Sequence, residues 1–219
     1  MLIRAALFDF DGTLADSFAA ITASTNHVRE SYGLPALPES AVREYVGLGL
    51  HQLMADLAPG ADPDEAVTRY RAHHGSVMFG GTKLLPGVAE VIPELARRGF
   101  QLAVCSNKQV AFTRELVTHF GLGSYFAAVL GPDDVGDRAK PDPAMLFEAC
   151  SRLGVTPGET VYVGDIAVDV HTAKAAGIPV WLVPGGAGGR ESATDAGPDR
   201  QLAAFADLLA LLPPLVSVR

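Results

Sequence analysis

The chain of 219 residues contains only two cysteines, Cys105 and Cys150. Two thiols cannot build a disulfide framework, and neither belongs to a CxxC pair. Cys105 lies in the apolar run "LAVCSN", where a small buried thiol is expected. The sequence therefore argues against a disulfide-stapled fold and against a metal site built on cysteine.

Long apolar runs are also missing. No segment approaches the ~20 apolar residues that cross a bilayer, and the tail "LAAFADLLALLPPLV" is interrupted by Asp207 and Pro213-Pro214. Only four apolar residues separate Arg4 from Asp9, which is too short for the apolar stretch of a signal peptide. We therefore expect a cytoplasmic protein without a membrane partner.

Lysine and arginine form no run, and the net charge is −8, from 17 basic and 25 acidic residues. This balance argues against nucleic acid as a partner, but it permits a small anionic substrate because local groups decide a binding site. The composition, 48% hydrophobic and 19% charged, is typical of a globular protein with a sizeable core. Nothing in the sequence indicates an oligomeric state.

Short apolar runs alternate with helical patterns along most of the chain. The runs cover residues 3–10, 100–106, 126–131, 160–165 and 179–184, and the helical patterns cover 87–99, 110–121, 143–154 and 168–177. Continuous apolar strands separated by helices predict a parallel sheet that is covered on both faces. The expected fold class is α/β, with a doubly wound, Rossmann-like core.

Residues 17–83 interrupt this alternation. They contain four helical patterns and no convincing strand, which predicts a small all-helical domain inserted after the first strand. We expect a core formed by residues 1–15 and 84–219 and a helical domain formed by residues 16–83. The later stretch "PGGAGGR" lacks the spacing of a phosphate-binding loop, so a plain flexible loop is expected there.

Two aspartates, Asp9 and Asp11, follow the first apolar run. Side chains two apart on a strand share a face, so both should project beyond its carboxyl end, where α/β sheets form their ligand crevices. Gly12 then permits a sharp exit from the strand. A turn cap would account for one of these acids but not for both.

A second acidic pair, Asp165 and Asp169, stands at another strand end in "YVGDIAVD". Four residues apart at the start of a helix, the two can converge on one point, although ordinary capping explains Asp169 equally well. Four acids near two strand ends need a cation to offset their repulsion. Hard oxygen ligands favour Mg²⁺ as that cation.

Further polar residues follow a strand or precede a helix. Ser106 and Asn107 end the strand "LAVCSN", where a hydroxyl could bind a phosphate oxygen, although Ser-Asn also begins many loops. Lys140 precedes a proline, which holds it extended. Asp142 is a natural helix N-cap, with Pro143 at the first helical position. Each of these signals is weak when taken alone.

Taken in order, four motifs resemble those of the haloacid dehalogenase superfamily: "DFDGTL", the serine of "VCSN", the lysine of "KPDP", and "GDIAVD". The core pattern spans essentially the whole chain outside the helical insertion, and four motifs in order are a strong signal. The insertion resembles the small helical cap of the subgroup that contains phosphoglycolate phosphatases, as do "VREYVGLGL" and residues 84–108. The resemblance implies a phosphoric monoester hydrolase.

The resemblance also implies a role for each motif residue. Asp9 would be the nucleophile that forms an aspartyl-phosphate, and Asp11 would be the general acid and base. Ser106 would bind the phosphoryl group, and Lys140 would offset charge on it and on Asp9. The implied metal is Mg²⁺, held by Asp9, the backbone carbonyl of Asp11 and Asp165, with Asp169 as a ligand or in support.

The implied substrate is a small phosphorylated metabolite, with 2-phosphoglycolate as the first choice. The candidate substrate-binding residues are Gly12, Thr13, Ser106, Asn107 and Arg43. Arg43 could meet a substrate carboxylate, although an arginine on a helix surface is more often solvated. The cap would close on hinges near Ala15-Asp16 and Gly80-Gly81. Ile166 departs from the family pattern, because many relatives carry a small polar residue there.

Other functions stay open at this point. A sugar phosphomutase of the β-phosphoglucomutase type keeps both first-motif aspartates and differs in its cap. A phosphate- or metal-binding module without catalysis is disfavoured by four intact motif residues, Asp9, Asp11, Lys140 and Asp165. Asp11 also argues against the dehalogenases of the superfamily, which lack this acid/base aspartate.

Overall fold

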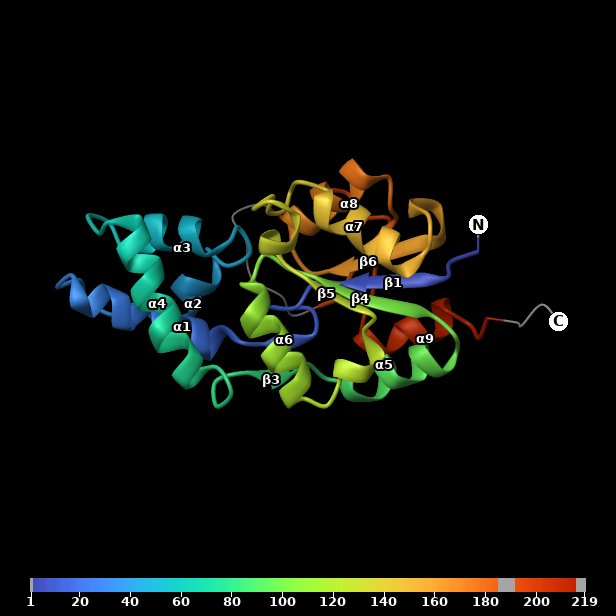
Figure 1. Cartoon of the computed structure of the whole chain (residues 1–219), viewed down its shortest axis with the longest axis horizontal. Helices are drawn as coiled ribbons and strands as arrows, with labels where there is room; N and C mark the ends of the chain where they lie inside the picture. Colours follow the sequence, from blue (N-terminus) through green and yellow to red (C-terminus); the bar gives the residue numbers. More distant parts are fainter. Residues whose placement is uncertain (1, 185–191, 216–219) are drawn as a thin grey trace.

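The computed structural model describes residues 2–184 and 192–215. Figure 1 shows a sheet with helices on both of its faces, and a second group of helices, α1 to α4, at one end of that sheet. The predicted glycine-rich loop lies, apart from Pro184, outside the described residues. None of the described helices is long and apolar enough to cross a membrane.

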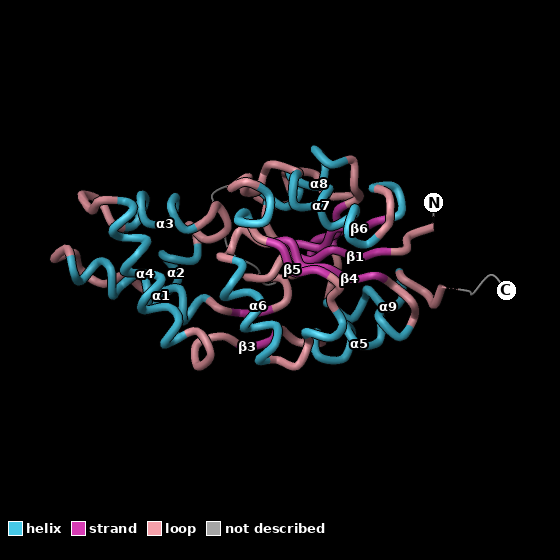
Figure 2. The backbone as a smooth tube through the Cα atoms, viewed as in Figure 1, coloured by secondary structure: helices cyan, strands magenta, loops and turns pink. Residues whose placement is uncertain are grey.

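The core is built on a six-stranded sheet (Figure 2) in the order β5-β4-β1-β6-β7-β8. Its strands are β1 Ala5–Phe8, β4 Gln101–Cys105, β5 Ala128–Leu130, β6 Thr160–Gly164, β7 Val180–Leu182 and β8 Arg200–Gln201. All neighbouring strands are parallel, so the predicted α/β class is confirmed. β8 has two exposed residues and no apolar run, so the sequence does not predict it.

Helices cover both faces of this sheet. They are α5 Val88–Arg97, α6 Val110–His119, α7 Ala144–Leu153, α8 Ala167–Ala176 and α9 Leu208–Leu211, with short 3-10 turns at Gly123–Tyr125, Pro132–Val135, Pro157–Glu159 and Phe205–Asp207. In β1, Ala6 and Phe8 face the hydrophobic cluster under α5 and α6, whereas Leu7 faces the cluster under α7 and α8. Because both faces of the strand are buried, its apolar run is continuous rather than alternating.

Four helices form the inserted cap: α1 Phe18–Ser31, α2 Glu39–Arg43, α3 Leu50–Leu57 and α4 Pro63–Val77. They enclose a hydrophobic cluster of their own, which includes Phe18, Met54 and Tyr70. Local sequence fixes the start of α4, because the Asp62 carboxylate accepts a hydrogen bond from the Glu65 N–H at 2.9 Å. The predicted all-helical cap after the first strand is therefore present.

A two-stranded ribbon joins the cap to the core. β2 Ala15–Asp16 pairs antiparallel with β3 Lys83–Leu84, so that Ala15 lies opposite Leu84. The sequence does not predict this ribbon, because two residues are too few to show a periodicity. The pairing brings the two chain crossings side by side and supports the boundaries proposed at 15/16 and 83/84, which stay a prediction.

Gly81 lies against α1 at this junction. A Cβ atom on Gly81 would lie 2.8 Å from Ala20 Cβ and 2.9 Å from Ala20 Cα and N. We expect Gly81→Ala to lower the free energy of unfolding by ~1–3 kcal/mol, because backbone atoms cannot move aside as the tip of a side chain can. Gly80→Ala is the matched control, since its nearest atom would be the Val77 carbonyl oxygen at 4.0 Å. Urea unfolding curves measure both, and equal midpoints would contradict the prediction.

Candidate active site

The polar residues identified in the sequence gather at the carboxyl edge of the sheet. Asp9 follows β1, Ser106 follows β4 and Asp165 follows β6, and all three are buried. β1 ends at the residue before Asp9, so Asp9 and Asp11 lie in the turn beyond the strand rather than on it. The Asp9 N–H still donates to the Val163 carbonyl at 2.9 Å, which fixes Asp9 at the sheet edge.

The turn after Asp9 gives Asp11 a different set of partners. Gly12 has a φ of +88°, a conformation that favours glycine, and its N–H donates to the Ala15 carbonyl at 2.8 Å. Lys108 Nζ lies 3.2 and 3.3 Å from the two Asp11 carboxylate oxygens, and the Ser17 hydroxyl donates to Asp11 Oδ1. Asp11 is thus held between a lysine of the core and the residue that precedes α1.

Lys140 is the centre of a buried ion cluster. Its ammonium lies 2.9 Å from Asp9 Oδ1 and 2.7 Å from Asp169 Oδ1, and it donates to the Tyr162 hydroxyl at 3.1 Å. Burial alone would lower the pKa of Lys140, but the carboxylates of Asp169 and Asp9 hold it above its ordinary value. Burial raises the pKa of Asp9 to about 6, although the Lys140 ammonium opposes the rise.

Asn107 holds the backbone of Lys140 in place. Its Oδ1 accepts from the Lys140 N–H at 2.7 Å, and its Nδ2 donates to the Lys140 carbonyl at 3.0 Å. The same Nδ2 donates to the Gly47 carbonyl in the cap at 2.9 Å. Asn107, a candidate substrate-binding residue, lines the cavity described below, but its amide binds backbone groups of the core and of the cap.

Asp169 orients both the strand end and the lysine. Its Oδ2 accepts from the backbone N–H groups of Asp165 at 3.0 Å and Ile166 at 3.2 Å, while Oδ1 accepts from Lys140 Nζ. The Tyr162 hydroxyl lies 3.1 Å from the same Oδ1. The sequence suggests two roles for Asp169, a helix cap and a member of the acidic cluster. In the structure Asp169 has both, because it caps α8 with one oxygen and binds Lys140 with the other.

Three buried carboxylates meet beside Lys140. One oxygen from each of Asp9, Asp165 and Asp169 lies within 4.8 Å of the others. The Thr13 hydroxyl donates to Asp165 Oδ1 at 2.8 Å, so Thr13 positions a carboxylate, and neither Thr13 nor Gly12 lines the cavity. A set of oxygen donors of this kind suits a hard divalent cation.

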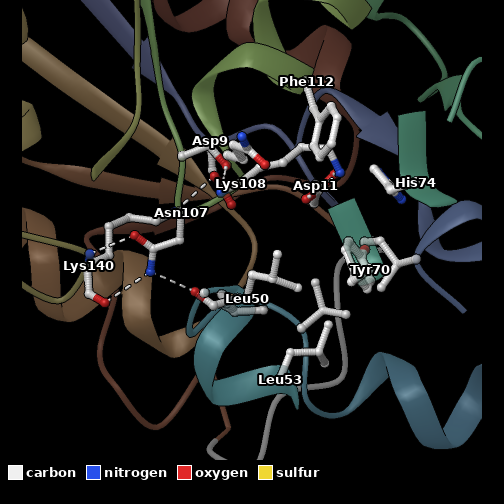
Figure 3. A pocket seen from close by; sticks show the side chains of 17 residues that line it. Asp9, Asp11, Leu50, Leu53, Tyr70, His74, Asn107, Lys108, Phe112 and Lys140 are labelled. Carbon is white, nitrogen blue, oxygen red and sulfur yellow. Dashed lines mark hydrogen bonds and ion pairs between the residues drawn. The ribbon is translucent and has the colours of Figure 1, made fainter. Parts of the chain in front are cut away.

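A cavity of about 60 Å³ lies between the core and the cap (Figure 3). The core lines it with Asp9, Asp11, Ser106, Asn107, Lys108, Gln109, Phe112, Lys140 and Ile166, and the cap lines it with Ile21, Val46, Gly47, Gly49, Leu50, Leu53, Tyr70 and His74. The core side is charged and the cap side is mostly apolar. This division suits a small ligand with a charged end and an apolar end.

Comparisons with known proteins agree with this geometry. The sequence pattern of the haloacid dehalogenase-like hydrolase family matches residues 6–183. The phosphoglycolate phosphatase of Cupriavidus necator is 36% identical over 216 residues, which cover 96% of this chain and 93% of that protein. The chain is a haloacid dehalogenase-like hydrolase. The predicted family and the enzyme class, phosphoric monoester hydrolase, are confirmed.

Solved structures share the fold of this hydrolase. A predicted phosphoglycolate phosphatase from Haemophilus somnus superposes with a TM-score of 0.85 at 26% identity, covering 96% of this chain and 98% of that one. CbbY from Rhodobacter sphaeroides, solved in complex with phosphate, superposes with a TM-score of 0.83 at 27% identity, covering 96% and 99%. Both comparisons include the cap as well as the core.

Arg43 of the hydrolase does not line the cavity. Its guanidinium lies 3.2 Å from Glu39 Oε1 and 3.6 Å from Asp16 Oδ1, and its Cζ stands 3.9 Å from the centre of the Phe18 ring. These contacts hold Arg43 at the junction of cap and core. The structure therefore does not place Arg43, a candidate substrate-binding residue, at the cavity.

Ile166, the departure from the family pattern, contacts the cap. It is buried, and together with Val168 it belongs to the hydrophobic cluster of the cap helices. A Cβ atom on Gly47 would overlap Ile166 Cδ1, so the Ile166 side chain lies directly against the Gly47 backbone. The backbone N–H of Ile166 still donates to Asp169, and the side chain links the fourth motif to the cap.

Two cavity residues, Lys108 and His74, have no predicted role in the sequence analysis. Lys108 directly follows Ser106 and Asn107 in "CSNK". Its position next to two candidate site residues could have identified it as a further site residue. His74 stands four residues after Tyr70, so both share the inner face of α4. His73, adjacent in sequence, instead stacks on His27, with the ring centres 4.3 Å apart, and does not line the cavity.

His74 makes stability depend on pH. Burial lowers its pKa to about 3, against an ordinary value of 6.5, so between these values only the unfolded chain binds the proton. Stability is therefore lost as the pH falls below 6.5. We expect the wild type to lose ~2 kcal/mol more unfolding free energy between pH 7 and pH 5 than His74→Phe. Urea unfolding at both pH values tests this, and parallel losses in the two proteins would contradict it.

Proposed function

We propose that this hydrolase is a Mg²⁺-dependent phosphatase that cleaves a small phosphate monoester through an aspartyl-phosphate intermediate on Asp9. The observation that supports the proposal best is the Asp9–Lys140 ion pair at 2.9 Å, set at the sheet edge beside two further buried carboxylates. A cytoplasmic location and a small phosphorylated metabolite as the binding partner are part of the same proposal.

The charges of the site fit a divalent cation. The buried carboxylates of Asp9, Asp165 and Asp169 exceed the single Lys140 ammonium by two negative charges, which one divalent ion would balance. Asp9 Oδ1 is buried and pairs with Lys140 at 2.9 Å. Asp9, Asp165 and the Asp11 backbone carbonyl would hold Mg²⁺, with Asp169 in support because it already accepts three hydrogen bonds.

The reaction needs little besides positioning and charge balance. A carboxylate oxygen of Asp9 attacks phosphorus, and the bond between phosphorus and the ester oxygen breaks. Asp11 gives a proton to the leaving alkoxide and later removes one from the water that hydrolyses the aspartyl-phosphate. Lys140 and the Ser106 hydroxyl bind the phosphoryl oxygens. When bound, Mg²⁺ would neutralise charge on the phosphoryl group and on Asp9.

The lining of the cavity and the relatives both bear on the substrate. The mostly apolar cap side of the cavity lies opposite the charged groups that would bind the phosphate, so it faces the organic group of the ester. Relatives such as the Cupriavidus necator protein are named phosphoglycolate phosphatases, which makes 2-phosphoglycolate the first compound to test.

A panel of phosphate esters tests the proposal. We expect Mg²⁺-dependent phosphate release from 2-phosphoglycolate or another short monoester, and its loss when EDTA removes the metal. Sugar phosphates, nucleoside monophosphates and pyrophosphate complete the panel. Conversion of β-glucose 1-phosphate to the 6-phosphate would favour a phosphomutase instead. No release from any ester with Mg²⁺ present would overturn the proposal.

Asp9→Asn tests the nucleophile directly. The change removes the attacking oxygen anion at nearly constant volume, so we expect kcat to fall by roughly 10³-fold or more. Asp142→Asn is the matched control: Asp142 Oδ1 accepts from the Ala144 N–H at 2.8 Å at the start of α7, and asparagine caps equally well. The helix begins at Ala144, one residue later than the sequence predicts. Unchanged hydrolysis by Asp9→Asn would show that another group attacks phosphorus.

A further inference from the structure

His74 stands at the cap end of the cavity and has no part in the proposed chemistry. Figure 3 shows it beside Tyr70, across the cavity from Asp9. Its ring stacks on Tyr70 at 5.1 Å and meets the edge of Phe112 at 5.0 Å, and its side chain is buried. All three rings line the cavity.

The hydrogen bonds around His74 favour one position for its ring proton. Nδ1 lies 3.0 Å from the Ser24 hydroxyl oxygen, and that hydroxyl donates its own proton to the Ala20 carbonyl at 2.9 Å. Ser24 can then only accept from His74, so Nδ1 is the N–H donor of the pair. Burial lowers the pKa of His74 to about 3, so the ring is neutral near pH 7. In this tautomer Nε2 carries a lone pair.

Nε2 is buried and has no hydrogen-bond partner among the described residues. A buried acceptor without a donor is unfavourable, and the cavity is where a donor can come from. The lysines that line the cavity have other partners: Lys108 pairs with Asp11, and Lys140 pairs with Asp9 and Asp169. A hydroxyl group on a bound ligand would supply this donor in place of a water molecule.

We propose that His74 Nε2 accepts a hydrogen bond from a hydroxyl group on the organic part of the substrate, so that the enzyme prefers short hydroxylated phosphate monoesters. This inference rests on the proposed phosphatase function and narrows its substrate class. It favours other esters than 2-phosphoglycolate, whose organic part carries a carboxylate, an acceptor at neutral pH, and no hydroxyl. The apolar side chains around His74 suit a short carbon chain that carries the hydroxyl.

Two esters of equal size test the inference: 2-hydroxyethyl phosphate and n-propyl phosphate, in which a methyl group replaces the hydroxyl. We expect the wild type to have a kcat/KM about ten-fold higher for the hydroxylated ester, the effect of one hydrogen bond. If neither ester is hydrolysed, both are tested as inhibitors of the hydrolysis of a third ester. The ratio of their two inhibition constants then replaces the ratio of kcat/KM values. In His74→Phe, which keeps the aromatic stacking, the ratio should fall to about one.

His73→Phe is the matched control. His73 lies on the same helix and its Nδ1 is 3.3 Å from the same serine hydroxyl, but it does not line the cavity, so the ratio should stay at the wild-type value. Circular dichroism checks that each variant is folded. A wild-type ratio near one would overturn the inference and leave the phosphatase proposal intact. Absence of Mg²⁺-dependent release from every ester would instead overturn the phosphatase proposal.

Discussion

The site depends on one buried ammonium. Lys140 lies between the carboxylates of Asp9 and Asp169, and none of the three would be stable as an isolated charge in this interior, where removal from water costs several kcal/mol per ion. Asp169 in turn accepts from the backbone at the end of β6, and Asn107 clamps both backbone groups of Lys140. The ion cluster and its hydrogen bonds thereby fix the relative positions of four loops, which follow β1, β4, β5 and β6.

The same cluster is connected to the cap. Asn107 reaches the Gly47 carbonyl with the Nδ2 that also binds Lys140, and Ile166 inserts into the hydrophobic cluster of the cap helices. Ser17, directly before α1, donates to Asp11. The charged half of the cavity and the lid over it are therefore not independent, because residues of the first, second and fourth motifs each contact the cap. A change in the position of the cap would disturb the surroundings of the phosphate site.

Much of the fold and the charged site is readable from the sequence, for a physical reason. Strands buried on both faces must be apolar throughout, so the exceptions at their carboxyl ends, Asp9, Ser106 and Asp165, stand out. The cap side gives no comparable signal. Tyr70 and His74 occupy ordinary positions on a helix of the cap. The sequence makes Arg43 a candidate for binding a substrate carboxylate, whereas in the structure it forms ion pairs at the junction of cap and core. Contacts between distant segments decide these roles.

The ribbon of β2 and β3 has a consequence for the architecture of the family. Because Ala15 pairs with Leu84, the chain leaves the core and returns to it at adjacent points. The core can therefore form whatever the length of the segment between β2 and β3, and even a hairpin turn could connect these two strands. The cap is in this sense a replaceable module: its helices can diverge, lengthen or be exchanged while the sheet and its ion cluster keep their geometry. New specificity can arise there as long as the contacts of Ser17 with Asp11 and of Gly47 with Asn107 are kept.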